Sequence, residues 1–351
     1  MHYLKVEKEN NLVKFKDFLY TEYKIFHIMK LRLDEIMRKK IKIIAFVILT
    51  MLIFGILFLG FFIGNETFKG LTNSTPREVT VKNISKYKKN YEKFAKDKDV
   101  EEIKIKSSKF EHEIPAIFVK NNNSNKICVM VHGMGASKYS MYNPGQIFYD
   151  LGYSLLIYDQ RNSGYNKAKY STFGVLESFD ALDCIKYVRK NIKKNGEIVL
   201  FGESYGAASS LIAASRDKSN IDYLILDCPV SDSNYFSDKV FEKIEKDQKI
   251  PASIMKFTGN IFLKARLGFT LEDINTIKWI KGEKLDIPTL IINSDSDTIT
   301  PQYMGEDIYK AIDSKDKEIY TAKSYDHIKF CEENPQDYKK VINNFLDKNK
   351  K

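Results

Sequence analysis

The sequence "IVLFGESYGAAS" at residues 198–209 joins an apolar run to a Gly-x-Ser-x-Gly motif. Four apolar residues precede Gly202, and small residues that a helix tolerates follow Gly206. This context predicts a buried β-strand, a tight turn at Ser204 and a helix that begins directly after the turn. The motif alone arises by chance in about one chain in twenty of this length and glycine content. Its meaning therefore depends on the rest of the chain.

From residue 100 onward, short apolar runs alternate with longer amphipathic stretches. The runs predict strands at 100–108, 112–120, 127–133, 153–159, 197–202, 221–227, 288–294 and 318–323. A pair of alternating strands followed by strand–helix units is typical of a mainly parallel sheet with helices on both faces. The sequence thus predicts an α/β protein.

Residues 233–285 interrupt this alternation. They carry helical patterns and the single tryptophan, Trp279, but no strand of the main series. In a parallel sheet, such an excursion lies over the carboxyl ends of the strands, where ligands bind. We expect a small helical cap over a pocket, and a long crossover connection is the alternative.

Residues 43–64 form a separate feature, because these 22 residues carry no charge and Thr50 is their only polar side chain. As a helix they would span about 33 Å, enough to cross a hydrocarbon core of about 30 Å. A buried core helix rarely lacks a polar face over six turns. A cleaved signal peptide has a shorter apolar region and a small-x-small end. We therefore expect a retained transmembrane helix that anchors the chain.

The basic sequence "MRKKIK" at 37–42 directly precedes the apolar segment. The positive-inside bias then predicts a single-pass protein of the cell membrane with residues 1–42 in the cytoplasm and the remainder outside. Residues 65–99 are expected to form a polar connector, and residues 100–351 the folded domain. Met29 and Met37 are alternative starting residues, so the sequence leaves the status of residues 1–36 open.

The net charge of +10 does not indicate nucleic-acid binding, because only seven of the 56 basic residues are arginine. Bidentate contacts to phosphates and bases favour arginine. Residues 1–42 alone hold 11 basic and 6 acidic residues. No Cys-x-x-Cys or His/Cys cluster suggests a metal, and no cofactor is implied. The four cysteines are expected to be free and buried: Cys128, Cys184, Cys228 and Cys331.

A serine nucleophile needs a base, and the chain has five histidines, at positions 2, 27, 112, 132 and 327. Only His327 follows the last predicted strand, where a loop can reach back over the sheet. The orienting acid should lie between the serine and the histidine in the chain. The sequence "LIINSDSDTITP" supplies Asp297, which we favour, and Asp295. Asp227 and Asp232, after the preceding strand, are further candidates.

The sequence "VHGMG" at 131–135 follows a predicted strand, and its glycines let the backbone approach a substrate closely. The backbone N–H groups of Met134 and Tyr205 are the expected oxyanion-hole donors. His132 is then expected to shape this turn rather than to act as a base.

Six motifs in order carry a family resemblance: "VMVHGMG", "YDQRNSG", "TFG" followed by Glu177 and Asp180, "GESYGAAS", "PTLIINSDSDTITP" and "DHIKF". Over residues 100–348 the chain resembles the α/β-hydrolase superfamily. It looks most like the serine-aminopeptidase-like branch, which includes membrane-anchored hydrolases. The resemblance implies an eight-stranded, mostly parallel sheet and a triad of Ser204, Asp297 and His327.

Some positions depart from the family pattern. Ser294 stands where a glycine is common before the acid, and no glycine precedes His327. No catalytic group is lost. An internal ion-pair set that braces the sheet is expected from four further charged residues: Asp159, Arg161, Glu177 and Asp180.

Together, these features predict a membrane-anchored serine hydrolase that cleaves an ester or amide bond of a small-molecule or peptide acyl substrate. A carboxylic ester hydrolase is the favoured form, and a serine peptidase or aminopeptidase is the alternative among enzymes. A non-catalytic binding protein on the same fold is the alternative from another class.

Overall fold

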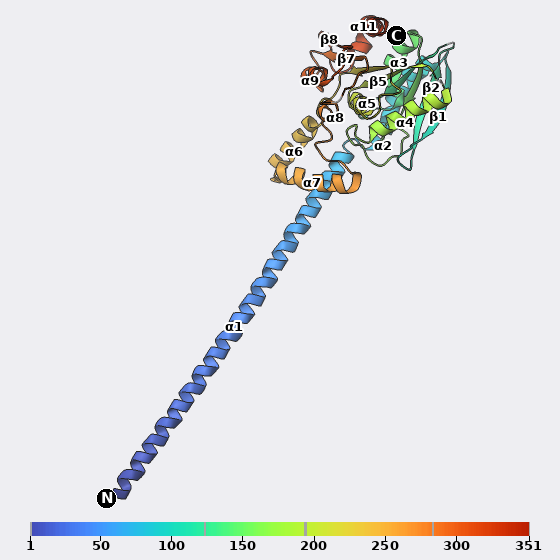
Figure 1. The fold of residues 1–351 in the computed structure, drawn as a ribbon. Coiled ribbons are helices and arrows are strands. Elements are labelled where there is room, and N and C mark those ends of the chain that lie inside the picture. The colour runs from blue at the N-terminus through green and yellow to red at the C-terminus, as the bar shows by residue number, and fades with distance from the viewer. Residues whose placement is uncertain (1, 123, 193–194, 283, 351) are drawn as a thin grey trace. The chain divides into compact units, whose positions relative to one another are not determined.

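The computed structural model describes residues 2–122, 124–192, 195–282 and 284–350, with side chains from residue 13 onward (Figure 1). The chain divides into two compact units between Phe62 and Ile63. The first unit is one continuous helix, the greater part of α1 (His2–Thr72). Its most apolar 18-residue window has a mean hydropathy of 2.9, and none of its residues is buried. By length and composition, this helix could cross a membrane.

The second unit is built on an eight-stranded sheet. Its strands are β1 (Asp99–Lys106), β2 (Glu113–Lys120), β3 (Lys126–Val131), β4 (Ser154–Tyr158), β5 (Glu197–Glu203), β6 (Tyr223–Asp227), β7 (Thr289–Ser294) and β8 (Lys317–Ala322). They lie in the order β1-β2-β4-β3-β5-β6-β7-β8. The β1–β2 and β2–β4 pairs are antiparallel, and the others are parallel. The predicted α/β fold class with a mostly parallel eight-stranded sheet is confirmed.

Helices cover both faces of the sheet, because successive residues of its buried strands point to opposite sides. Val129 and Val131 of β3 join a cluster with α4 (Glu177–Tyr187), α5 (Tyr205–Arg216) and α9 (Tyr303–Ala311). Cys128 and Met130 face the other way. They pack with α3 (Tyr142–Asp150), α10 (Lys329–Glu333) and α11 (Pro335–Lys348). Two short turns complete these layers, a 3₁₀ turn at Lys138–Met141 and a π turn at Val188–Ile192.

Between β6 and β7 the chain forms α6 (Asn234–Gln248), α7 (Ala252–Leu267) and α8 (Ile277–Ile280). We call residues 233–285 the cap segment. Its buried side chains form an apolar cluster with Tyr205 of α5 and with the loop around Phe173. The described part of the cap segment contains no strand of the main sheet.

The end of α1 and α2 (Arg77–Ala95) belong to the second unit. Phe68 and Leu71 of α1 are buried in the apolar cluster of the cap segment. Tyr91 and Phe94 of α2 are buried against the sheet. The stretch that the sequence suggests as a connector is thus built into the folded unit, because both helices carry an apolar stripe at helical spacing.

Candidate active site

Ser204 occupies a strained turn between β5 and α5. Its φ is 54° and its ψ is −120°, a backbone conformation that residues other than glycine rarely adopt. The glycines on either side permit the turn. A Cβ at Gly202 would lie 2.4 Å from the Gly206 carbonyl oxygen, and one at Gly206 would lie 2.1 Å from the Val131 carbonyl oxygen. The Ser204 N–H donates a 2.8 Å hydrogen bond to the Asp227 carbonyl at the end of β6.

Asp297 and His327 meet at the carboxyl ends of β7 and β8. Nδ1 of His327 lies 2.7 Å from Oδ2 of Asp297. The other carboxylate oxygen of Asp297 accepts hydrogen bonds from the N–H groups of Ile299, at 2.8 Å, and Thr300, at 2.7 Å. Burial acts to raise the pKa of Asp297. The hydrogen bond and charge of His327, together with the Thr300 contacts, outweigh burial and lower that pKa. Asp297 is therefore held as a carboxylate.

Hydrogen bonds between two loops fix this pair. Ser294, at the position where the family often has glycine, donates from its hydroxyl to the Tyr325 carbonyl. Asp295 accepts a 2.7 Å hydrogen bond from the Ser324 N–H and forms a 3.4 Å ion pair with Lys323. Asp295, the alternative acid, thus supports the loop that carries the histidine and does not bond the imidazole.

The other candidate acids are also engaged elsewhere. Asp227 accepts a 2.8 Å hydrogen bond from the Tyr338 hydroxyl. Asp232 accepts a 2.9 Å hydrogen bond from the Asn234 N–H, as a turn residue does. Among the four candidates, Asp297 is the one that bonds His327.

Ser204 and the Asp297–His327 pair lie at the same edge of the sheet, because β5, β7 and β8 run parallel, with β6 between β5 and β7. The link runs through the end of β6. Asp227 accepts from the Ser204 N–H, and the next residue, Cys228, accepts a 3.1 Å hydrogen bond from the Thr300 hydroxyl. The described residues include no partner for Ser204 Oγ. Catalytic hydrogen bonds often tighten only when substrate is bound.

The turn after β3 lies beside the serine. A Cβ at Gly133 would lie 3.5 Å from Ser204 Cβ and 4.0 Å from Ser204 Oγ. Among the described residues, the N–H groups of Met134 and Tyr205 donate to no other group, so both are available to an oxyanion. His132 is fully buried. Its Nδ1 lies 2.7 Å from the Gly133 carbonyl, and its Nε2 accepts from the Gln160 N–H at 3.0 Å. Both ring nitrogens are thus used in shaping the turn.

Two buried carboxyl groups lie beneath the serine. Burial, together with the charge of the nearby Asp227, raises the pKa of Glu203 to about 8. Burial likewise raises the pKa of Asp227 and outweighs the hydrogen bond from Tyr338, which acts to lower it, so that this pKa is about 6. The pair is therefore protonated in part at neutral pH, which limits the negative charge beneath the site.

Comparisons with known proteins agree with this architecture. Residues 127–266 match the family model for the α/β-hydrolase fold. The chain has the α/β-hydrolase fold. The curated protein YqkD of Bacillus subtilis, described as uncharacterized, is 25% identical over 241 residues, which cover 68% of this chain and 77% of YqkD.

Two solved structures are similar in fold at low sequence identity. The esterase Pf2001 of Pyrococcus furiosus superposes with a TM-score of 0.58 at 20% identity, covering 72% of this chain and 93% of the esterase. The α/β hydrolase GrgF from Penicillium sp. sh18 gives a TM-score of 0.55 at 14% identity, covering 72% and 99% of the two chains.

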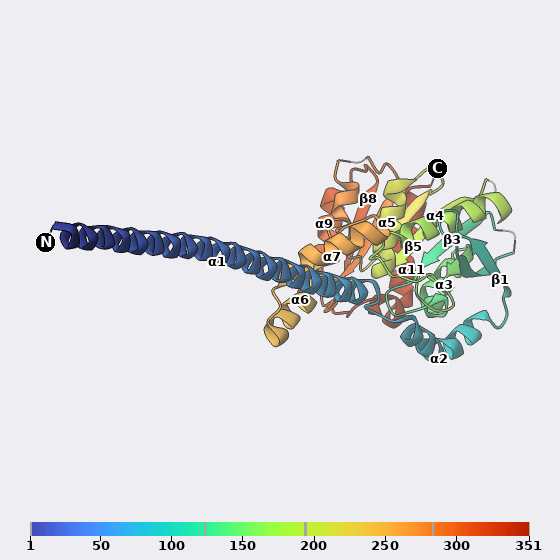
Figure 2. The same ribbon diagram turned by 90° about the horizontal axis from the view of Figure 1, so that it is seen from below.

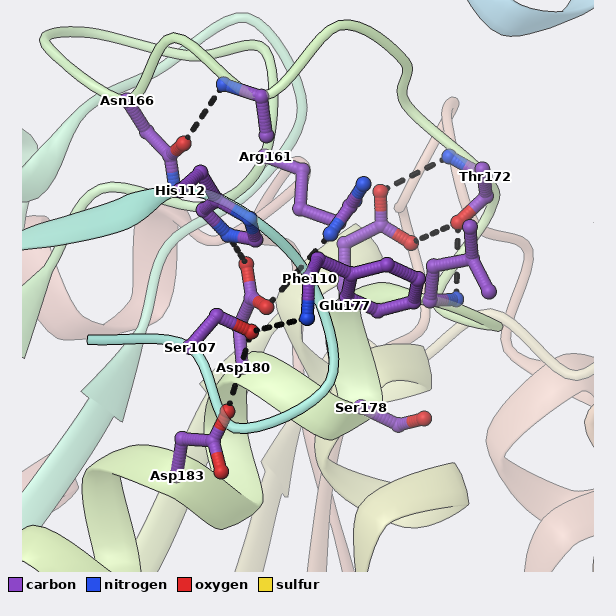
Figure 3. Close-up of polar contacts among 12 residues, drawn as sticks. Ser107, Phe110, His112, Arg161, Asn166, Thr172, Glu177, Ser178, Asp180 and Asp183 are labelled. Atoms are coloured by element: carbon purple, nitrogen blue, oxygen red, sulfur yellow. Dashed lines mark hydrogen bonds and ion pairs between the residues drawn. The ribbon is translucent and has the colours of Figure 1, made fainter. Parts of the chain in front are cut away.

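The charged residues expected to brace the α/β-hydrolase sheet form separate groups rather than one set, and Figure 3 shows the contacts of Asp180 and Glu177. Arg161 pairs with Asp180 at 3.6 Å, and His112 contacts the same carboxylate at 2.9 Å. Asp159 pairs instead with Lys138 at 3.2 Å. Glu177 forms no ion pair among the described residues and bonds Thr172, whose hydroxyl donates at 2.6 Å. The expected ion-pair set is thus confirmed for Arg161 and Asp180 and wrong for Glu177. The N–H groups of Thr172 and Gly174 donate to the Glu177 carboxylate instead.

One cluster in this α/β-hydrolase fold combines three side chains of the types that bind metal ions. Cys228, Asp297 and His327 each place one such atom within 4.8 Å of the others. A metal would require the thiolate. Burial instead raises the pKa of Cys228 well above its usual value. The hydrogen bonds to Asp297 suit an acid–base pair better than a metal centre.

Thr300 and Glu203 are site residues that no sequence motif indicated. Thr300 follows Asp297 by three residues and precedes a proline, a spacing typical of a side chain that closes a turn before a helix. Glu203 occupies the variable position before the serine, and its burial becomes visible only once β5 is placed at the centre of the sheet.

Proposed function

We propose that this chain is a membrane-anchored serine hydrolase that cleaves carboxylic esters through a Ser204–His327–Asp297 triad. The observation that carries the proposal is the strained Ser204 turn at the carboxyl end of β5, at the same edge of the sheet as a 2.7 Å Asp297–His327 pair. Serine strained at such a turn projects its hydroxyl above the sheet, where a base on a neighbouring loop can reach it.

The chemistry follows from these positions. His327 takes the proton of Ser204 as the hydroxyl attacks the acyl carbonyl, and then returns it to the leaving alcohol. Asp297 holds Nδ1 of the imidazole and stabilises its positive charge. The N–H groups of Met134 and Tyr205 stabilise the oxyanion, aided by the amino end of α5. Water, activated by His327, then hydrolyses the acyl-enzyme.

An ester is favoured over a peptide because the residue after the serine belongs to an apolar cluster. Tyr205, directly after Ser204, belongs to a buried cluster with Phe173 and Leu176 and with Met255 and Leu263 of α7. This cluster suits an acyl chain. The structural neighbour Pf2001 is named an esterase. The peptidase or aminopeptidase alternative would need an acidic subsite for an amino terminus.

The apolar segment 43–64 supports membrane anchoring. It is long enough to span a bilayer, and the basic sequence at 37–42 precedes it. The positive-inside bias then places the hydrolase unit outside the cytoplasm.

A fluorophosphonate probe tests the nucleophile on the full-length protein in detergent. We expect labelling of wild type and of Ser219→Ala, an exposed serine that serves as the control. Ser204→Ala and His327→Ala should abolish labelling. Acyl esters and aminoacyl amides then separate esterase from peptidase. A folded wild type that neither labels nor turns over either substrate would favour the non-catalytic binding protein.

A further inference from the structure

Helix α7 of the cap segment has two apolar faces. Met255, Thr258, Gly259 and Leu263 are buried on the inner face. The outer face carries Ile254, Phe257 and Ile261, which are 43%, 69% and 52% exposed. Their spacing of three and four residues places them on one side of the helix. A soluble surface seldom aligns three large apolar side chains in this way.

The inner face of α7 packs against the end of α1 (Figures 1 and 2). A Cβ at Gly64 would lie 2.8 Å from the Phe262 ring, and one at Gly259 would lie 2.6 Å from Thr67. Arg266 donates a 3.0 Å hydrogen bond to Asn65. All these residues belong to the second compact unit. The chain enters that unit directly from the apolar segment 43–64, so α7 lies beside the residues where this segment ends.

The charges of α7 suit an anionic lipid surface. Its sequence holds Lys256, Lys264 and Arg266 and neither aspartate nor glutamate. Lys256 is paired with Asp238 of α6 at 2.8 Å, which leaves the helix with a positive balance. An amphipathic helix with an apolar face and basic residues is typical of segments that lie in the interface of a bilayer.

We infer that α7 lies in the headgroup–acyl boundary of the bilayer, with Ile254, Phe257 and Ile261 in contact with lipid. This inference rests on the proposed anchor at 43–64. Because the inner face of α7 shares an apolar cluster with Tyr205, the helix connects the membrane surface with the neighbourhood of Ser204. The substrate class is then an acyl ester of a membrane lipid, drawn from the bilayer rather than from solution.

Lipid contact can be measured on the full-length protein in vesicles of phosphatidylcholine and phosphatidylglycerol. The four native cysteines are buried, so a thiol-reactive NBD fluorophore will label an introduced cysteine selectively. Phe257→Cys reports on α7, and Phe54→Cys reports on the apolar segment. Val100→Cys in β1, also exposed, is the matched control.

We expect brominated lipids to quench NBD at positions 54 and 257 and to leave position 100 unchanged. Quenching at 54 without quenching at 257 overturns the inference, and a second copy or a soluble partner then covers α7. No quenching at 54 overturns the anchor and the inference with it. Fluorophosphonate labelling in the same samples reports the hydrolase chemistry separately.

Turnover provides an independent test. Phe257→Asp should lower the hydrolysis of a long-chain ester embedded in vesicles by about tenfold, because the substitution removes a large apolar contact with lipid. It should leave both a soluble short-chain ester and fluorophosphonate labelling unchanged. Val100→Asp should change none of the three. An equal loss on the soluble and the embedded ester would contradict a role at the membrane.

Discussion

The Tyr338 hydroxyl of α11 donates a 2.8 Å hydrogen bond to Oδ2 of Asp227, which is buried beside Glu203 under the candidate nucleophile. The contact joins the last helix of the chain to the centre of the sheet. It satisfies one oxygen of an acidic pair that burial keeps partly protonated.

This acidic pair predicts a pH-dependent stability. The pKa values of Glu203 and Asp227 are raised to about 8 and about 6 from ordinary values of 4.5 and 3.8. The native state therefore binds more protons than the unfolded state, and the free energy of unfolding should fall as pH rises from about 4 to about 8. Glu203→Gln should flatten this slope and raise Tm at pH 8.5 relative to wild type. Thermal unfolding at pH 5 and 8.5 measures both.

The exposed Glu101→Gln is the control for that experiment and should leave the pH slope as in wild type. A slope that Glu203→Gln leaves unchanged would show that Glu203 is ionised in the folded protein.

Asp297→Asn should lower kcat by about 10³–10⁴, because the amide no longer stabilises the imidazolium or fixes its tautomer. Asp295→Asn should retain most activity, since Asp295 bonds Ser324 and Lys323 rather than His327. Steady-state hydrolysis of a short-chain ester separates the two variants. Comparable losses in both would remove the basis for choosing Asp297.

Thr300→Val should reduce kcat by about tenfold, because it removes the hydroxyl that contacts Oδ2 of Asp297 at 2.8 Å and the Cys228 carbonyl at 3.1 Å. Thr300→Ser keeps the hydroxyl and should restore most of the rate. Thr300 is a positioning residue, so the loss should appear in kcat rather than KM. An unchanged kcat in the valine variant would mean that the two backbone N–H groups suffice to hold Asp297.

Gly206→Ala should destabilise the protein by roughly 1–3 kcal/mol or more and abolish probe labelling, because the added methyl overlaps the Val131 carbonyl. Gly70→Ala is the control. It lies in α1 with open space around it, so the same added methyl should be neutral or slightly stabilising. Thermal unfolding and fluorophosphonate labelling of both variants check this. Normal labelling of Gly206→Ala would mean that the turn tolerates a wider geometry.

Local pattern was enough to locate the strands. Each predicted strand overlaps an observed one, and Ser204 lies in the turn that its glycines predict. These features depend on neighbouring residues, because apolar alternation and glycine flexibility act over a few positions. The position of His327 after β8 likewise follows from chain order.

Partner choice among buried polar groups depended on the tertiary structure. The ion pair of Asp159 with Lys138 joins residues 21 positions apart. It forms because the 3₁₀ turn that begins at Lys138 lies beside β4, and Asp159 directly follows this strand. Asp297 and Asp295 are only two residues apart in one loop, so chain order does not separate them. The hydrogen bonds of Asp295 with Ser324 and of Ser294 with Tyr325 place Asp297, rather than Asp295, against His327.

The sequence by itself determined the α/β pattern, the candidate nucleophile and the long apolar segment, because each depends on residues that are close together in the chain. Only the tertiary structure decided which acid meets His327, that Glu203 and Asp227 are buried together, and that α7 packs on the end of α1 with an apolar face exposed. Hydrogen bonds and burial depend on distances across the fold, and local periodicity does not encode those distances.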